Sequence, residues 1–586
     1  MSGSYLETLP CALPSRPLPQ DLEIETTITN FEDVLPNLDA SSFVADAVWR
    51  DMVALTGSIR TFYGASKIIE IWKTLTEKAR PKHFKYHPNS ARDVRLGDAQ
   101  WIEGVFDFEI DETPARLCKA IISLVPTQDG KWRIWVLRTV IDKLQNHPSV
   151  DKMAPASSTI KSNQTTHEDS DEFECAVIGG GQAGLSVAGR LQSQGVKYVL
   201  LEKNAQVGDS WKNRYRSTKL HTTRESSHLP FDRTFPPHYP EYLSKDDLAQ
   251  GYLEWSKKFG INAWLSTTVV SGQWHEDQQR WSLNLLRNGE RKNITATHIV
   301  AALGAGCQIP VMPTYPGVER FQGKILHSAE YTSPEDWQGK HGIVVGTANT
   351  AHDVAEDMVA ADMASVTMVQ RSPTYVLPAE YYTKVQHRSY NPEIPTEWAD
   401  LMGLTSPIGV GRLVTMRILH AMAKAEPERF DNLEKAGFKL NRYGDLIYQV
   451  MDRFGGHYMD VGASAKISKG LIKMKSDALP LQYTEHGITF TDGTELKADL
   501  VVFATGFVGS MKVAIHDLLG SDVAERIEDF WGIDEEGEIK GAFRPSGHPN
   551  LWMHGGTCIH ARYMSRFVAL QVRAALDGTP LPIATV

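Results

Sequence analysis

The chain has 586 residues, of which 42% are hydrophobic and 23% charged, with a formal net charge of −10. This length exceeds what one hydrophobic core supports and predicts three or four domains. The dispersed charge excludes a typical nucleic-acid binder, and no apolar stretch is long enough to cross a bilayer. The start of the chain lacks the pattern of a secretory signal, and the five cysteines are widely spaced, which predicts reduced thiols in a cytoplasmic protein. We also expect no metal site, because the histidines and cysteines are not clustered at ligand spacing.

Residues 1–150 are predicted to form a separate α+β domain. We expect a helical stretch from Asn37 to Tyr63 and then strands at Gln100 to Ile110, Ala115 to Val125 and Lys131 to Val140. This order is similar to the cone-shaped fold of nuclear transport factor two and the polyketide cyclases. Four tryptophans in this domain are either core and docking residues or part of a second active site: Trp49, Trp101, Trp132 and Trp135. A polar linker follows at residues 151–172, where Ser, Thr and Asp predominate.

The run CAVIGGGQAGLSVAGRLQSQGVKYVLLEK contains a complete dinucleotide-binding pattern. A β-branched strand precedes Gly179, Gly181 and Gly184, an Ala- and Leu-rich helix follows, and a second strand ends at Glu202. In this pattern the first glycine permits the tight turn, the second admits a pyrophosphate to the helix N-terminus, and the third allows helix and strand to pack closely. The acid at the end of the second strand accepts a hydrogen bond from a ribose hydroxyl.

A second, less regular pattern begins at Gly346 in HGIVVGTANTAHDVAEDM. Alanine occupies the positions of the second and third glycines, and Asn349 and Thr350 are further candidate cofactor contacts. The next strand ends at Arg371, where a basic residue replaces the acid. Arginine at this position suits the 2′-phosphate of NADPH, although a surface arginine after a strand remains the alternative.

Three further elements resemble the class B flavoprotein monooxygenases, which include the flavin-containing monooxygenases, the YUCCA enzymes and the Baeyer–Villiger monooxygenases. They are the stretch GDSWKNRYRS with Trp211 and Arg214, the linker element from Phe321 through His327 to Tyr331, and the late strand Ala504-Thr505-Gly506-Phe507. The resemblance runs from about Phe173 to the C-terminus and implies FAD and NADPH as cofactors. It adds Trp211, Arg214, Thr505 and Gly506 to the predicted cofactor contacts. Fungal members often carry an N-terminal domain of the kind expected here.

The same resemblance supplies three candidate catalytic residues, His221, Arg214 and His327. His221 occupies the position where animal flavin-containing monooxygenases have an asparagine beside the flavin, and its Lys-Leu-His run is similar to the YUCCA enzymes. The imidazole titrates near neutral pH and can hydrogen-bond the flavin or the oxygen on it, but a histidine held in a polar loop fits equally well. His327 is expected to couple the two domains rather than to touch oxygen.

Together these patterns predict an α/β protein with two Rossmann-like domains, the second inserted in the first. We assign residues 173–330 and 501–586 to the FAD-binding domain and residues 331–500 to the NADPH-binding domain. Within the insertion, Leu413 to Ala423 has helical spacing and either roofs the active site or packs in the core. Near the end, Arg562 and Ser565 either contact cofactor or substrate, or cap a buried helix.

The predicted activity is insertion of one atom of molecular oxygen into a small organic substrate through a flavin peroxide, as in the tailoring of fungal secondary metabolites. One alternative is an NADPH-dependent flavin reductase or oxidase that releases hydrogen peroxide. Another is a non-catalytic nucleotide-binding scaffold. We expect no nucleic-acid partner and no membrane anchor, and a homodimer is the assembly that we consider.

Overall fold

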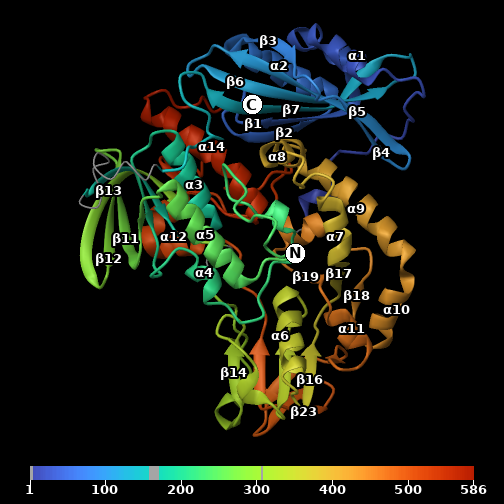
Figure 1. Cartoon of the computed structure of the whole chain (residues 1–586), viewed down its shortest axis with the longest axis vertical. Coiled ribbons are helices and arrows are strands. Elements are labelled where there is room, and N and C mark those ends of the chain that lie inside the picture. Colours follow the sequence, from blue (N-terminus) through green and yellow to red (C-terminus); the bar gives the residue numbers. More distant parts are fainter. Residues whose placement is uncertain (1–3, 157–169, 305–307, 586) are drawn as a thin grey trace.

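A computed structural model describes residues 4–156, 170–304 and 308–585, and its elements form three sheet-based regions (Figure 1). The N-terminal region is a seven-stranded sheet in the order β2-β1-β7-β6-β5-β3, with β4 paired to β5. Only the β1–β7 pair is parallel. The elements are α1 (Ile24–Thr29), β1 (Phe43–Met52), β2 (Ile59–Tyr63), α2 (Ala65–Ala79), β3 (Pro81–Tyr86), β4 (Arg92–Leu96), β5 (Ala99–Ile110), β6 (Arg116–Pro126) and β7 (Trp132–Leu144).

The helix predicted from Asn37 to Tyr63 is wrong, because β1 and β2 occupy most of that segment. Its Val, Trp, Phe and Ile side chains suit a strand, and pairing of β1 with β7, more than eighty residues away, decides the outcome. The three later strand predictions are confirmed as β5, β6 and β7.

The tryptophans of this sheet lie on opposite faces. Trp49 packs against Trp72 of α2, with ring centroids 5.2 Å apart, in the core of the domain. Trp101 and Trp135 form an edge-to-face pair in a separate cluster that includes Val410 of α9 (Ile408–Ala425). The arrangement matches the interpretation of these side chains as core and docking residues.

The second region is a sheet in the order β10-β9-β8-β13-β12-β11, with β25 paired to β13. Its β10-β9-β8-β13-β25 portion is parallel, as in a Rossmann-like domain, and β11, β12 and β13 form an antiparallel meander. The strands are β8 (Glu172–Ile178), β9 (Tyr198–Leu201), β10 (Ala263–Trp264), β11 (Thr267–His275), β12 (Arg280–Arg287), β13 (Glu290–Ala301) and β25 (Leu551–Met553). The helices are α3 (Gln182–Ser193), α4 (Asp209–Lys212), α5 (Lys245–Phe259), α12 (Lys512–Leu519), α13 (Ser521–Arg526) and α14 (Cys558–Leu576).

The third region contains a five-stranded parallel sheet in the order β14-β24-β15-β16-β20. Its elements are β14 (Lys324–His327), β15 (His341–Val345), α6 (Asn349–Ala360), β16 (Ser365–Val369), α11 (Ala463–Ser468), β20 (Lys473–Lys475) and β24 (Leu500–Phe503). Two small sheets consist of β17 (Thr374–Pro378), β18 (Leu440–Asn441) and β19 (His457–Asp460), and of β21 (Pro480–Tyr483), β22 (Gly487–Phe490) and β23 (Glu495–Lys497). The remaining helices are α7 (Ala379–Gln386), α8 (Thr396–Leu404), α9 and α10 (Pro427–Lys435).

Sheet pairing moves two of the expected domain boundaries. Boundaries at residues 330 and 500 assign β14 to the first dinucleotide domain and break the second sheet at the start of β24. Both strands instead pair inside the second sheet, where β24 is central. After the insertion, β25 pairs with β13 of the first sheet, and α12 and α14 pack against that region, α12 on β11 and α14 on α3. A local pattern identifies such strands but does not reveal which sheet they join.

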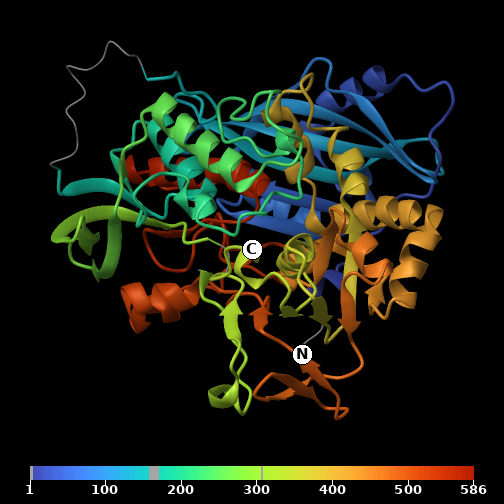
Figure 2. The same ribbon diagram turned by 60° about the horizontal axis from the view of Figure 1, so that its bottom comes forward.

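The N-terminal sheet lies against α14 and α8 in both views of the ribbon (Figure 1; Figure 2). At the start of the predicted linker, Asp151 is ion-paired with Arg190 of α3 and, at 2.8 Å, with Arg566 of α14. The linker segment 157–169 lies outside the described residues. Among the cysteines that the structure describes, all four are unpaired, and Cys307 lies outside the described residues. No helix in the described part of the chain is both long and apolar enough for a membrane span.

Candidate active site

The first glycine loop joins β8 to α3 with little space to spare. Gly179 has φ +107°, and a Cβ there would lie 2.4 Å from the carbonyl oxygen of Ala302. A Cβ on Gly184 would lie 1.8 Å from the carbonyl oxygen of Gly179, so helix and strand are in direct contact. At Gly181, which precedes α3, a Cβ would meet no protein atom within 4 Å. No side chain caps α3, so its first N–H groups face this space and can receive a pyrophosphate.

Glu202 lies directly beside this loop. Its Oε2 accepts a 2.6 Å hydrogen bond from the backbone N–H of Gly180, and its Oε1 accepts bonds from the backbone and side chain of Asn204. The residue is 5% exposed. Because Oε2 accepts only this one bond and has a further lone pair, the side chain can still accept a ribose hydroxyl.

One aromatic and one basic residue, Trp211 and Arg214, lie near the start of the same helix. The indole N–H of Trp211 points to Gln182, the first residue of α3, at 3.4 Å. The guanidinium of Arg214 lies 5.2 Å from the Trp211 ring, and Arg214 is exposed. Arg214 is therefore a neighbour of the first loop rather than of a buried centre.

The second loop joins β15 to α6 in the same manner. Gly346 has φ +125°, and a Cβ there would lie 2.4 Å from the carbonyl oxygen of Ala504. Asn349 begins α6, but its Oδ1 accepts a 2.8 Å bond from Met459 and so ties α6 to β19. Thr350 is half-buried in the first turn, and Arg371 is exposed just beyond the carboxyl end of β16. The helix N-terminus, again without a side-chain cap, and an exposed cation after the next strand fit a phosphorylated dinucleotide.

The late strand and the linker element meet through His327. Its Nδ1 accepts a 3.1 Å bond from the amide of Ala329, so the proton is on Nε2, which donates to the carbonyl oxygen of Gly506 at 3.2 Å. Burial lowers the pKa of His327, which keeps the ring neutral. Thr505 donates to the carbonyl oxygen of Val311 at 2.5 Å. Both ring nitrogens of His327 are thus occupied by backbone groups of the second dinucleotide region, in which β14 pairs with β24. The expected coupling of the two domains by His327 stays a prediction.

His221 lies where the first dinucleotide region meets α6 of the second. Its Nε2 is 3.3 Å from Oδ1 of Asp353, although the bond lacks hydrogen-bond geometry, and the other oxygen of Asp353 accepts a 2.7 Å bond from the Tyr215 hydroxyl. His221 and Asp353 are both buried. Of the three catalytic candidates, His221 alone occupies a buried junction between the two regions.

Further imidazoles surround this junction. His352 stacks on Tyr458 with ring centroids 3.6 Å apart, and burial lowers its pKa to about 4. His457 is similar, because burial and the neighbouring His221 lower its pKa to about 4. Within the described residues, one ring nitrogen of each has no hydrogen-bond partner. Such orphaned polar atoms mark a place where a polar ligand can complete the hydrogen bonding.

Sequence reasoning missed Asp353, which contacts two residues of the first region. One signal was present: Asp353 and Asp357 are four residues apart, and so share one face of an otherwise Ala- and Val-rich helix. Asp357 accepts a 2.7 Å bond from Ser217, so this acidic face follows the segment from Tyr215 to His221.

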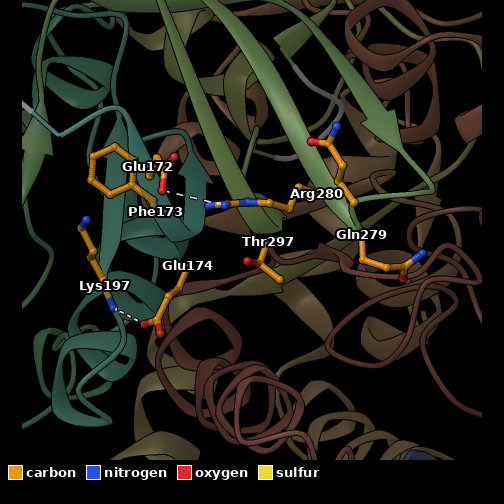
Figure 3. Close-up of a pocket in the computed structure, with 8 residues that line it drawn as sticks. Glu172, Phe173, Glu174, Lys197, Gln279, Arg280 and Thr297 are labelled. Carbon is orange, nitrogen blue, oxygen red and sulfur yellow. Dashed lines mark hydrogen bonds and ion pairs between the residues drawn. The ribbon is translucent and has the colours of Figure 1, made fainter.

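A groove of about 400 Å³ lies at the amino end of β8 (Figure 3). Its walls include Glu174, which accepts a 2.7 Å bond from the backbone of Lys197, and Arg280, 3.8 Å from Glu172. The seven residues of β8 separate this groove from Gly179 by roughly 20 Å. The groove is therefore not part of either dinucleotide loop.

Comparison with known proteins identifies the family. Residues 173–519 match the family model of the flavin-binding monooxygenase-like proteins, and because the match covers more than half of the chain, the chain belongs to this family. The chain is 28% identical over 348 residues to the probable indole-3-pyruvate monooxygenase YUCCA3 of Arabidopsis thaliana, covering 58% of this chain and 74% of that protein. It is 27% identical over 357 residues to the FAD-containing monooxygenase EthA of Mycolicibacterium smegmatis, covering 57% and 69%.

Solved structures show the same fold. A mutant cyclohexanone monooxygenase from Rhodococcus sp. Phi1 bound to NADP⁺ superimposes with a TM-score of 0.51 at 16% identity, covering 70% of this chain and 86% of that chain. The predictions of a class B flavoprotein monooxygenase, of two Rossmann-like domains and of FAD and NADPH as cofactors are confirmed. The family match begins at residue 173, so the fungal-type N-terminal domain stays a prediction.

Proposed function

We propose that this enzyme uses NADPH and molecular oxygen to insert one oxygen atom into a small organic substrate, of the kind modified in secondary metabolism. The observation that carries the proposal is the pairing of two dinucleotide loops with opposite chemistry after their second strands, Glu202 in one and Arg371 in the other. An acid suits the ribose hydroxyls of FAD, and an exposed arginine suits the 2′-phosphate of NADPH.

FAD, when bound, supplies the hydride and oxygen chemistry that no side chain performs. The chain's own groups bind and orient the reactants. The N–H groups at the start of α3 hold a pyrophosphate, and Glu202 holds a ribose. The buried junction of Tyr215, His221 and Asp353 excludes water and presents an imidazole as a hydrogen-bond donor. The balance is one NADPH, one proton and one O₂ consumed for one oxygenated product, one NADP⁺ and one water.

A cytoplasmic location and a homodimer are further parts of the proposal. The unpaired cysteines among the described residues support a reducing compartment. Gel filtration with light scattering would measure the mass, and a monomer would remove the homodimer from the proposal.

The substrate class is tested with four probes: a thioether, an amine, and two compounds suggested by the names of the relatives. Indole-3-pyruvate is a 2-oxo acid and cyclohexanone a cyclic ketone. Purified enzyme is supplied with NADPH and ¹⁸O₂, and the NADPH consumed, peroxide released and ¹⁸O in the product are measured. We expect one ¹⁸O atom per NADPH for an accepted substrate. Peroxide equal to NADPH with thioether, amine, ketone and 2-oxo acid probes alike would establish an oxidase instead.

A further inference from the structure

Two arginines of the N-terminal domain reach into the helical insertion. Arg50 of β1 donates from Nη1 to the carbonyl oxygens of Leu404 and Ser406, at 2.7 and 2.8 Å. Arg138 of β7 donates from Nη1 to the carbonyl oxygen of Met402 at 3.1 Å. Both arginines are 2% exposed. Their targets are two of the last carbonyls of α8 and the carbonyl of Ser406, two residues beyond it.

These contacts complete the C-terminus of α8. The last four carbonyls of a helix have no partner within it, and the negative end of the helix dipole favours a cation. Thr405 donates to the carbonyl oxygen of Leu401 at 2.6 Å, and the two arginines supply donors to the carbonyls of Met402 and Leu404. Glu538 holds Arg50 in place with two hydrogen bonds of 2.7 and 2.6 Å. The end of α8 is therefore capped largely by side chains of the N-terminal domain.

Within the same helix, Asp400 holds a third buried arginine. Its two oxygens accept bonds of 2.6 and 2.7 Å from Arg562 of α14. Burial by itself lowers the pKa of Arg562, but attraction to the adjacent Asp400 carboxylate raises the pKa by more than burial lowers it. The guanidinium therefore stays charged. Its free nitrogen, Nη1, donates to the carbonyl oxygens of Ser226 and His228 at 2.8 and 2.7 Å.

Ser226 and His228 lie five and seven residues after His221 in one continuous segment. This segment has few regular elements, since only the single turn Arg224–Ser226 is helical. Arg562 therefore fixes the downstream end of the segment that carries His221. Loops without regular structure depend on such side-chain bonds for their position.

We propose that Arg50 and Arg138 are positioning residues. They cap α8, α8 sets Asp400, and Asp400 orients Arg562, which holds residues 221–228. The N-terminal domain thereby participates in the reaction through the order of this segment. The series of contacts from Arg50 and Arg138 to residues 221–228 does not depend on what His221 does. Only the expected effect of these contacts on oxygenation rests on the proposed function of His221.

The test uses the full-length, FAD-loaded enzyme and the double variant Arg50→Met with Glu538→Met, which removes a buried ion pair without leaving an unpaired charge. The matched control is Arg544→Met. Arg544 is 7% exposed and bonds to the Ile59 carbonyl of the N-terminal sheet, and its other hydrogen-bond partners, Glu528 and Asp534, lie outside α8. Hydrogen exchange is measured for peptides covering residues 396–406 and 221–229.

In the double variant we expect amide exchange in both peptides to rise by about tenfold or more, as for the loss of a hydrogen bond to a charged donor. Exchange in β1 and in the control should stay near the parent's. Peroxide released per NADPH should rise in the double variant only. Faster exchange in 396–406 with an unchanged 221–229 peptide, or equal changes in both variants, would overturn the proposal.

Asp400→Asn removes the carboxylate that holds Arg562, without changing any residue of the N-terminal domain. It should loosen 221–229 without altering exchange in the N-terminal sheet, so the proposal remains testable if the double variant does not fold. An Asp400→Asn enzyme with a fully protected 221–229 peptide would refute the transmission step. If the segment loosens but coupling of NADPH to product is unchanged, the proposed role of His221 fails while the positioning chain stands.

Discussion

In the first glycine loop, adding one methyl group should affect cofactor binding alone at one glycine, and both binding and folding stability at another. Gly181→Ala places a Cβ where no protein atom lies within 4 Å, whereas Gly184→Ala places it 1.8 Å from the carbonyl oxygen of Gly179. Real Cβ contacts essentially never fall below 3.0 Å, so α3 would have to move about 1.2 Å from β8, by 3.0 − 1.8. The two substitutions are otherwise identical in chemistry.

The expected magnitudes follow from this geometry. Overpacking of this size costs about 3 kcal/mol of unfolding free energy at Gly184, at the upper end of the usual range. Gly181→Ala should leave the apoprotein as stable as the parent. Its methyl group occupies the approach of the pyrophosphate to the α3 N–H groups, and weakening one such charge-assisted bond costs about 1.5–3 kcal/mol, or about tenfold to hundredfold in FAD affinity.

The assay measures two quantities on each variant. Urea denaturation of the apoprotein gives the unfolding free energy, and flavin absorbance after desalting, followed by titration with FAD, gives the affinity. Gly181→Ala should lose FAD but not stability, and Gly184→Ala should lose both. A Gly181→Ala protein that binds FAD like the parent would mean that the phosphates do not approach this residue, and the assignment of the first loop would be refuted.

Three other predictions address the second loop, the junction and pH. Arg371→Ala should raise KM for NADPH by about tenfold or more while leaving KM for NADH nearly unchanged; equal losses in steady-state assays would remove the 2′-phosphate role. His221→Ala should leave flavin reduction nearly intact in anaerobic stopped-flow but raise peroxide per NADPH, with His221→Gln partly restoring coupling; a collapse of reduction would assign the residue to cofactor positioning. Burial lowers the pKa of His352 and His457 to about 4 from 6.5, so the unfolded state binds more protons between these values and stability falls as the pH drops through this window. Urea denaturation should show an unfolding free energy about 2 kcal/mol lower per histidine at pH 5 than at pH 7. An unchanged unfolding free energy would contradict the burial of these two histidines.

Local patterns predicted the cofactor loops well, because every requirement of such a loop lies within about thirty residues. The strand before Gly179, the helix after it and Glu202 at the end of the next strand all follow from neighbours in sequence. Elements decided by distant pairing were predicted poorly. The stretch from Asn37 to Tyr63 has helical features but forms two strands, since β1 pairs with the distant β7 and β2 pairs with β1. Likewise, β24 joins a sheet that its position along the chain did not indicate.

The residues of the site also fall into a group that local sequence patterns predict and a group that depends on distant contacts. The glycines and terminal residues of each loop were visible in the sequence, whereas the partners of His221 were not. Asp353 reaches His221 across more than a hundred residues, and Asp400 reaches Arg562 across an even longer separation. The bonds of Arg562 to Asp400 and to two loop carbonyls favour a structural role for this residue over contact with cofactor or substrate.

The segment after Trp211 is held from two independent directions. On one side, Tyr215 and His221 meet Asp353 of α6, and on the other, Arg562 of α14 holds the carbonyls of Ser226 and His228. Because α6 belongs to the second dinucleotide region and α14 to the first, any movement of one region relative to the other must act on this segment at its Asp353 end. Loss of Asp353 should therefore change how His221 responds to NADPH, whereas loss of Asp400 should disorder the segment whether or not NADPH is present. Hydrogen exchange of residues 221–229 in Asp353→Asn and Asp400→Asn, each with and without NADP⁺, separates the two effects, and identical responses would show that the segment is held as one unit.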